Sequence, residues 1–435
     1  MGFPGKLQVR SLLVFWLFLL SAVAYLDRTN ISIAGAHISQ EFGLGNVRLG
    51  WIFSAFLIGY AASQVLGGWL ATRFGPRRVL TFGVMWWGVF TAMTAVISPR
   101  IGGALALLIV IRFSLGVGEA VIYPASNQFV ANWIPVEERG RANGWIFAGV
   151  GAGAGLTPPL LTWIIMHYGW RASFWFSAVV GVIAGLIWYL IARDTPEEHP
   201  MVSSTELAHI QQGIAISRSE SELVPYSEKG APSIAWARLF RSREVLALTL
   251  SYFSFGYVAW IFFAWFYIYL AEARGLDLKS SALYAMLPFL GMTIASPTGG
   301  MANDWISRRH GLRWGRCGVG AVSLALAGVL LWFGPVVASA QLASVMLAAG
   351  AGVLYFAQSS YWSVSADIAG RQSGVMSGVM NMGAQIGGAV TASLTPVVAT
   401  RMGWSASFRI SAALALMGAV AWLFVDPKKT LDAAE

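Results

Sequence analysis

Charged residues and cysteine are both scarce in this sequence. Asp, Glu, Lys and Arg make up 11% of its 435 residues, whereas hydrophobic residues make up 57%. A chain so poor in charge leaves almost no room for a soluble domain. Its one cysteine, Cys317, excludes an internal disulfide and a cysteine-rich metal site, and the five histidines show no metal-ligand spacing.

Signals of catalysis are also missing. There is no nucleophile triad, no phosphate loop, and no pair of catalytic carboxylates outside one charge cluster described below. The glycine-rich run at residues 149–155 looks like a dinucleotide loop, but no strand precedes it and it lies within an apolar stretch. Close helix packing explains it better. We therefore expect neither an enzyme nor a cofactor.

Long apolar stretches recur along the whole chain, each about 20 residues long and so able to span a bilayer. They predict an all-α membrane protein. The twelve expected spans are residues 12–36, 49–71, 79–97, 103–126, 142–166, 172–192, 244–271, 280–302, 317–336, 341–366, 372–398 and 405–424.

The basic residues are unevenly distributed between the two sides of the membrane. Of 29 Lys and Arg, seven fall on one side (Arg48, Arg100, Arg171, Arg274, Lys279, Arg401 and Arg409), two fall inside spans, and the other 20 share the side of the termini. Because cytoplasmic loops carry the excess of Lys and Arg, we expect both termini to be cytoplasmic, in a bacterial inner membrane. Topology thus explains the net charge of +9, and nothing indicates nucleic-acid binding.

The chain divides into two related halves. A Pro- and Ser-rich segment, residues 193–243, predicts a cytoplasmic linker between six-helix bundles at 1–192 and 244–435. Gly67-Gly68 with Arg77-Arg78 is echoed by Gly299-Gly300 with Arg308-Arg309, and Gly169-Trp170 by Gly403-Trp404. Related halves are typical of transporters that work by alternating access.

Four charged residues fall inside the expected spans: Asp27 and Arg28 in the first, Arg112 and Glu119 in the fourth. Each costs about 2.5 to 3.5 kcal/mol at membrane depth, so they mark a functional site or a packing device. Counting from the span ends predicts Asp27 opposite Arg112, with Glu119 as a relay. Protonating either acid would free a guanidinium for a substrate anion, because arginine stays charged whereas a carboxylate does not. The alternative is a structural ion-pair network.

Several motifs resemble one transporter family. They are Tyr25-Leu-Asp27-Arg28-Thr-Asn30, Arg112-Phe-Ser-Leu-Gly116-Val-Gly118-Glu119, Trp133-Ile-Pro135 and Asp194-Thr-Pro196. Together they resemble the anion:cation symporter family of the major facilitator superfamily, which includes bacterial galactonate, hexuronate and glucarate carriers. Three departures stand out: Thr72 replaces the usual acidic loop residue, the seventh span lacks a proline at 265–269, and residues 147–155 offer no amide where sugar-acid carriers place one.

The resemblance implies roles for individual residues. It implies proton coupling by Asp27 and Glu119 and anion recognition by Arg28 and Arg112, with Tyr25 and Tyr60 lining the cavity. In the second half, the uncharged polar candidates for substrate binding are Tyr257, Ser359, Trp362 and Asn381. Buried tyrosines bonded to backbone and simple interhelical hydrogen bonds are the competing interpretations.

The sequence therefore predicts a twelve-helix major facilitator fold that imports a small organic anion, a sugar acid or other carboxylate, with protons. An exchanger or facilitator of other organic acids is the first alternative, and a non-transporting membrane sensor the second. The expected partners are the anion, protons and membrane lipid, and we expect a monomer.

Overall fold

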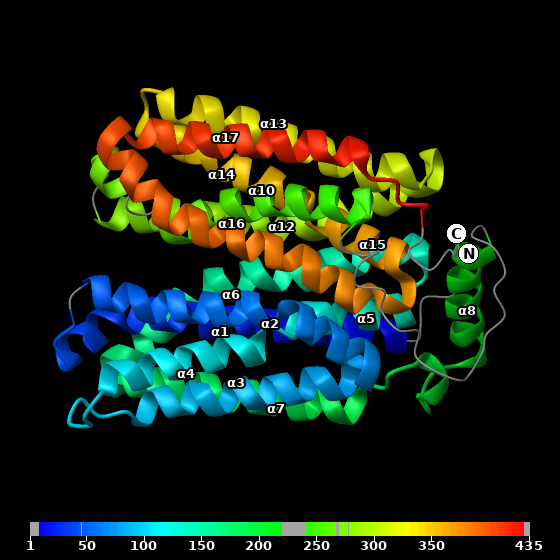
Figure 1. Ribbon diagram of the computed structural model, residues 1–435, viewed down its shortest axis with the longest axis horizontal. Helices are drawn as coiled ribbons and strands as arrows, with labels where there is room; N and C mark the ends of the chain where they lie inside the picture. The colour runs from blue at the N-terminus through cyan, green and yellow to red at the C-terminus, as the bar shows by residue number, and fades with distance from the viewer. Residues whose placement is uncertain (1–7, 45, 220–240, 267–268, 277, 430–435) are drawn as a thin grey trace.

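The computed structural model describes residues 8–44, 46–219, 241–266, 269–276 and 278–429 (Figure 1). All regular structure in these ranges is helical. Helices suit an apolar chain in hydrocarbon because each one satisfies its own backbone N–H and C=O groups. The predicted all-α membrane fold is confirmed.

The first half comprises seven helices. They are α1 (Val9–Phe42), α2 (Asn46–Phe74), α3 (Pro76–Val96), α4 (Ala104–Glu119), α5 (Ile122–Trp133), α6 (Arg139–Tyr168) and α7 (Trp170–Ile191), with the short helix η1 (Val136–Glu138) before α6. The fourth expected span is thus two helices, because the chain turns at residues 120–121.

The second half repeats this arrangement. It comprises α10 (Arg243–Ala264), the π-helix η3 (Tyr269–Ala273), α12 (Leu278–His310), the π-helix η4 (Arg313–Gly318), α13 (Val319–Phe333), α14 (Ala340–Phe356), α15 (Gln358–Ala369), α16 (Ser373–Met402) and α17 (Trp404–Ala421). The seventh span was expected to run to residue 271, but α10 ends at Ala264. The tenth is divided at Ala357, as the fourth is divided in the first half.

Ten segments of the described chain are long and apolar enough to cross a membrane. The other two expected spans, residues 280–302 and 372–398, lie in α12 and α16, helices of 33 and 30 residues that are less apolar. Their position explains this: α12 packs against α6 and α16 against α2, so both face the other half as well as lipid (Figure 1).

Residues 204–219 of the expected linker form α8 (Ser204–Ser219), which lies at one end of the molecule (Figure 1). Glu206 of α8 accepts hydrogen bonds from the backbone N–H groups of Val9 and Arg10, at 3.3 and 3.1 Å, so the start of α1 lies at this end too. We call it the α8 end. Linker residues 220–240 lie outside the described residues, and the boundaries of the two bundles stay a prediction.

At the α8 end, a network of four buried charges joins the two halves. Arg139 of α6 donates to Asp367 of α15 at 2.9 Å, and Arg316 of η4 donates to Asp367 at 3.0 Å and to Asp304 of α12 at 2.9 Å. Asp304 also accepts from the backbone N–H groups of Gly140 and Arg141, at 2.9 and 2.6 Å. We call Arg139, Asp304, Arg316 and Asp367 the closing network. It holds the halves together at this end.

One glycine of each repeated pair lies at a crossing between the halves. A side chain on Gly68 would come within 2.0 Å of the Gly374 carbonyl, and one on Gly300 within 2.2 Å of the Gly140 carbonyl. These crossings, α2 with the start of α16 and α12 with the start of α6, explain why the motif occurs once in each half. Backbones can approach this closely only where Cβ is absent.

The two crossings differ in charge. Where α12 supplies the carboxylate of Asp304 to the start of α6, the first half supplies the amide oxygen of Gln128, which accepts from the Gly374 N–H at 3.0 Å and from Thr72 at 3.2 Å. Thr72, the departure noted in the sequence, therefore takes part in an uncharged version of the same contact.

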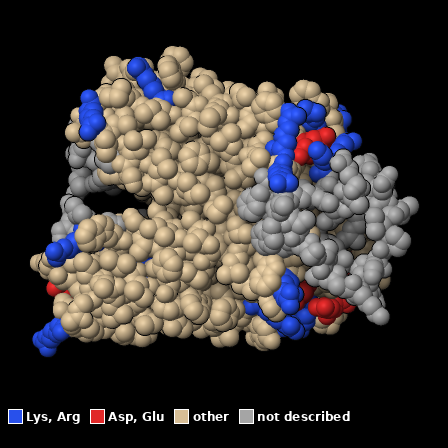
Figure 2. Space-filling view, in the orientation of Figure 1, with Lys and Arg blue, Asp and Glu red and all other residues tan. Residues whose placement is uncertain are grey.

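At the end opposite α8, the two halves are separated, and the space-filling view shows an opening between them (Figure 2). The hydrogen bonds between the halves described above all lie toward the α8 end. The molecule is therefore closed at the α8 end and open at the other.

Candidate functional site

Two of the four charges predicted to form the site are in direct contact. Arg28 of α1 forms an ion pair with Glu119 of α4, through Nε and Oε1. The Arg28 side chain is 7% exposed and that of Glu119 is fully buried. A buried pair of this kind is costly unless both partners stay together. The predicted site thus centres on Arg28 and Glu119, a pairing that the residue count did not indicate.

The turn in the fourth span positions Glu119. It is the last residue of α4, and α5 starts three residues later at Ile122. Pro124, the third residue of α5, has no N–H with which to bond the carbonyl of Ala120, so the helix cannot continue unbroken. Because the break comes directly after Glu119, this side chain lies at the joint between α4 and α5 and not in the middle of a continuous helix.

The expected direct pair between Asp27 and Arg112 is not found: within the described ranges, these two side chains form no ion pair within 4.0 Å. Instead, Asp27 Oδ2 accepts a hydrogen bond from the hydroxyl of Thr91 in α3. Asp27 is 1% exposed, and its other carboxylate oxygen is buried without a hydrogen-bond partner in the described chain. The prediction failed because counting depth along two helices fixes height but not the direction in which each side chain points.

Arg112 lies in α4, seven residues before Glu119, and is 2% exposed. Its guanidinium carbon lies 5.0 Å from the ring centroid of Phe56 in α2. Two of its nitrogens, Nε and Nη1, are buried without a hydrogen-bond acceptor among the described residues. A fixed positive charge with free donors is chemically suited to bind the oxygens of an anion.

Aromatic rings surround the Arg28 guanidinium. Its carbon lies 4.4 Å from the ring centroid of Tyr60, 4.7 Å from that of Tyr25 and 5.5 Å from that of Phe56. The Tyr25 ring in turn lies 5.8 Å from Phe263 of α10, so this part of α1 faces the second half. Tyr25 and Tyr60, both predicted site residues, are therefore neighbours of the charge, and they stabilise it through their ring faces.

Asn381, predicted from the second half, reaches the first half. Its amide donates to Gln64 Oε1 of α2 at 2.9 Å, and Gln64 lies one helical turn after Tyr60. Gln64 is fully buried, and its own amide nitrogen has no acceptor in the described chain. The two amides link α16 to the helix that carries the rings around Arg28.

The other second-half candidates lie apart from the charges. Tyr257 of α10 is 1% exposed and lies against Thr391 and Thr395 of α16. Trp362 of α15 donates to the Tyr252 hydroxyl at 3.0 Å, and its ring centroid lies 4.9 Å from that of Phe147 in the first half. Trp362 thus fills the contact between the halves.

Ser359 of α15 is fully buried, and its hydroxyl has no hydrogen-bond partner in the described ranges. It is a polar group available to a ligand only when the halves move. These second-half placements leave the predicted substrate contacts untested.

Residues that sequence reasoning missed at the site are Phe56, Gln64 and Thr91. Gln64 carried a usable signal, since an amide in an apolar span, one turn from a candidate tyrosine, is costly unless it is bonded. Phe56 and Thr91 carried none, because Phe and Thr are ordinary residues of spanning helices. In the described part of the chain, no group of three or more His, Cys, Asp or Glu is placed to hold a metal ion.

Comparison with known proteins places the chain in a family. The model of the Major Facilitator Superfamily matches residues 17–392, which is most of the chain. The chain belongs to the major facilitator superfamily. It is therefore a membrane transport protein and not an enzyme, and the resemblance drawn from the motifs is confirmed at this level.

Its relatives include proteins named as anion transporters. The chain is 34% identical over 434 residues to a probable sulfoacetate transporter of Cupriavidus necator, covering 99% of this chain and 97% of that protein. It is 31% identical to the chloroplastic ascorbate transporter of Arabidopsis thaliana, over 99% of this chain and 76% of the relative. It is 30% identical to a probable galactarate/D-glucarate transporter of Bacillus subtilis, over 70% and 67%.

Among solved structures, the proton:xylose symporter XylE bound to 6-bromo-6-deoxy-D-glucose superimposes with a TM-score of 0.76, covering 97% of this chain and 98% of XylE. The two are 16% identical, so this likeness concerns the fold alone.

Proposed function

We propose that this protein imports a small organic anion together with protons by alternating access. The observation that carries the proposal is the cluster of unpartnered polar atoms around the four buried charges. Among the described residues, Arg28 Nη2, Glu119 Oε2, Asp27 Oδ1 and two nitrogens of Arg112 are buried without hydrogen-bond partners. Buried polar groups are rarely left in this state, so their concentration at one place points to a ligand site.

The Arg28–Glu119 ion pair supplies the coupling. While Glu119 is ionised, it occupies Arg28, and the four groups carry no net charge. When Glu119 takes up a proton, Arg28 loses its counter-ion and the site gains one positive charge. An anion can then replace the carboxylate, because arginine stays charged in proteins and its planar guanidinium fits carboxylate or sulfonate oxygens.

Proton and anion therefore favour each other's binding. Linkage makes this reciprocal: an anion that binds better to the protonated site raises the site's affinity for the proton by the same factor. Arg112 is positioned to provide the second anion contact, and Asp27, held by Thr91, is the second candidate for protonation. In the alternative, the four charges only stabilise the helix bundle. Transport would then not depend on the protonation of Glu119.

We propose that the α8 end faces the cytoplasm of a bacterial cell, with both termini on that side. The distribution of Lys and Arg supports this orientation. The structure, open at the opposite end, would then be ready to accept an anion from outside the inner membrane. Closure there and separation of the closing network would release it inside.

For the substrate, we propose a small carboxylate or sulfonate with few hydroxyl groups. Two observations support it. The wall near the contact between the halves is aromatic, since the ring centroid of Phe147 lies 4.9 Å from those of both Tyr123 and Trp362, and Phe147 offers no amide to sugar hydroxyls. In addition, a relative that is 34% identical over nearly the full length of both chains is named as a probable sulfoacetate transporter.

The test uses purified protein in liposomes with an imposed pH gradient, acidic outside. The wild type should accumulate labelled sulfoacetate or another small acid. Glu119→Gln should retain exchange of external for internal anion but lose accumulation driven by the gradient, because the glutamine cannot be ionised. Glu41→Gln, which neutralises an acid near the open end and outside the spans, is the matched control and should behave as wild type.

Unchanged accumulation by Glu119→Gln would remove this residue from the coupling mechanism. Transport that needs internal anion in the wild type would instead favour the exchanger. A substrate panel of sulfoacetate, galactarate, D-glucarate, L-galactonate, tartrate and aromatic acids identifies the chemical class. Arg28→Ala should abolish binding of whichever anion is carried, and retained affinity would exclude Arg28 as its clamp.

A further inference from the structure

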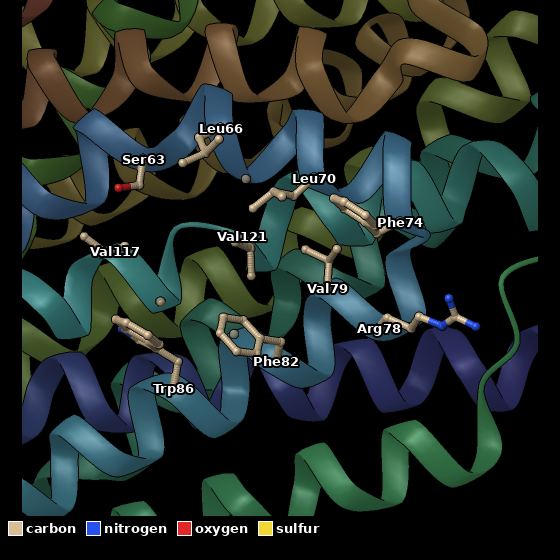
Figure 3. Close-up of a pocket in the computed structure, with 13 residues that line it drawn as sticks. Ser63, Leu66, Leu70, Phe74, Arg78, Val79, Phe82, Trp86, Val117 and Val121 are labelled. Carbon is tan, nitrogen blue, oxygen red and sulfur yellow. The ribbon is translucent and has the colours of Figure 1, made fainter. Parts of the chain in front are cut away.

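A groove on the outer surface of the first half lies between α2, α3 and α4 (Figure 3). Its volume is about 390 Å³. It is lined mainly by apolar side chains from the three helices and the turn after α4, among them Leu66, Leu70, Phe82, Trp86, Val117 and Val121. The one charged residue in its lining is Arg78.

The groove has the length of one bilayer leaflet. It runs along α2 from Ser63 to Phe74. Eleven residues of helix rise roughly 16 Å, and half of a hydrocarbon core of about 30 Å is about 15 Å. An acyl chain from a single leaflet therefore fits along it from end to end.

Arg78 closes the groove at the α8 end. It is the third residue of α3, its side chain is exposed, and it forms no ion pair within 4.0 Å in the part of the chain that the structure describes. Figure 3 shows its guanidinium beyond the apolar side chains, at the end of the groove. A free positive group at the level of the lipid headgroups, next to an apolar channel one leaflet long, matches the two parts of an anionic lipid.

We propose that this groove binds an anionic phospholipid of the leaflet on the α8 side, with one acyl chain along α2, α3 and α4 and its phosphate on Arg78. Besides Arg78, the lining holds two polar side chains, those of Ser63 and Trp86. The indole N–H of Trp86 is already satisfied, since it donates to the Ser114 carbonyl at 2.7 Å. The rest of the lining is apolar, as an acyl chain requires.

Occupancy would bear on the turn after α4. Of the residues that line the groove, Gly118 directly precedes Glu119 and Val121 lies in the turn itself. A bound chain packs against the outside of the joint whose inside carries the acid. The inference concerns lipid binding alone and does not depend on the proposed transport activity.

The experiment uses the full-length protein in nanodiscs containing a phosphatidylglycerol probe with a diazirine at the end of one acyl chain. After photolysis, labelled peptides are mapped by mass spectrometry. Label should concentrate on α2, α3 and α4 around the groove. Val117→Trp, which fills the groove, should remove most of that label. Val110→Trp places the same side chain two turns earlier on the exposed face of α4, outside the groove. This variant should leave the labelling of the groove unchanged.

The headgroup contact is tested separately. Arg78→Gln should weaken labelling by the phosphatidylglycerol probe about fivefold, the equivalent of about 1 kcal/mol for one basic residue near an anionic surface. A matched phosphatidylcholine probe should be unaffected. Arg309→Gln, at the corresponding place in the second half, is the control. If label spreads evenly over the lipid-facing helices, or is unchanged by Val117→Trp, the proposed lipid site is refuted. If Arg78→Gln reduces labelling by both probes equally, the proposed contact with an anionic headgroup is refuted.

Discussion

Asp304→Asn should shift the protein toward the state that is open at the α8 end. The Asp304 carboxylate receives two hydrogen bonds from the other half, from the N–H groups of Gly140 and Arg141 at 2.9 and 2.6 Å. These N–H groups belong to the second and third residues of α6, in its first turn, where the helix dipole adds to the attraction for a negative charge. Both bonds must break for the halves to separate at this end.

The magnitude follows from the charge. Gly140 donates to one carboxylate oxygen of Asp304 and Arg141 to the other, whereas an asparagine amide has a single acceptor oxygen. Hydrogen bonds to a charged group contribute about 1.5 to 3 kcal/mol and neutral ones about 0.5 to 1.5, so the substitution removes one charged bond and weakens the other by about 1 kcal/mol. The two losses give about 3 kcal/mol, or roughly a 150-fold change in the ratio of the two states. The bond from Arg316 to Asp304 lies within the second half and is left out of this sum.

Distances between spin labels measure the shift. In a Cys317→Ser background, one pair at Glu137 and Arg308 reports on the α8 end, and one at Tyr168 and Met402 reports on the open end. All four positions are exposed. Asp304→Asn should populate a longer distance for the first pair and a shorter one for the second.

Asp194→Asn provides the control. Asp194 accepts a hydrogen bond from the Arg77 N–H at 2.8 Å, but this bond joins the start of the linker to the first half and does not connect the two halves. It should leave both distance distributions unchanged. Identical distributions in Asp304→Asn and wild type would refute the claim that the closing network sets this equilibrium.

Three further predictions concern single contacts. Thr91→Val should change the pH dependence of transport by removing the hydrogen bond to Asp27, whereas Thr91→Ser should preserve it; equal pH profiles for both variants would contradict a role for Asp27. Gln64→Leu and Asn381→Leu should be non-additive in thermal unfolding by about 0.6 kcal/mol, the average for hydrogen bonds between membrane helices, and strict additivity would exclude the contact. Hydrogen bonds from Arg171 hold the pKa of Glu41 below its usual value. Glu41→Gln should therefore lower the melting temperature slightly near neutral pH, and the difference should disappear as the pH falls through the lowered pKa; a difference that persists in acid would contradict the pairing.

The sequence predicted the helical fold and the four buried charges because both depend on properties of single segments. Apolar length identifies a span, and an ionisable residue within it is costly wherever it points. The partner of each charged residue was harder to predict. Arg28 and Glu119 meet because α4 is oriented with its last residue toward α1, and this rotation leaves no trace in the spacing of either helix.

The closing network shows a second limit. Arg139 and Arg316 look like ordinary basic residues near span ends, and they were counted as such in assigning the orientation. In the structure, Arg316 is fully buried and Arg139 is 4% exposed. Their burial comes from packing one half on the other, which no property of a single span reveals.

Thr72 and Gln128 have a consequence for the order of movement. One crossing between the halves is fastened by a negative carboxylate, the other by a neutral amide, and neutral bonds are roughly half as strong. Separation at the α8 end should accordingly start between α2 and α16, before the bonds from α6 to Asp304 of α12 break. Opening toward the α8 end would then be asymmetric. The exit path for the anion would appear first between α2 and α16, where the bonds between the halves are weaker.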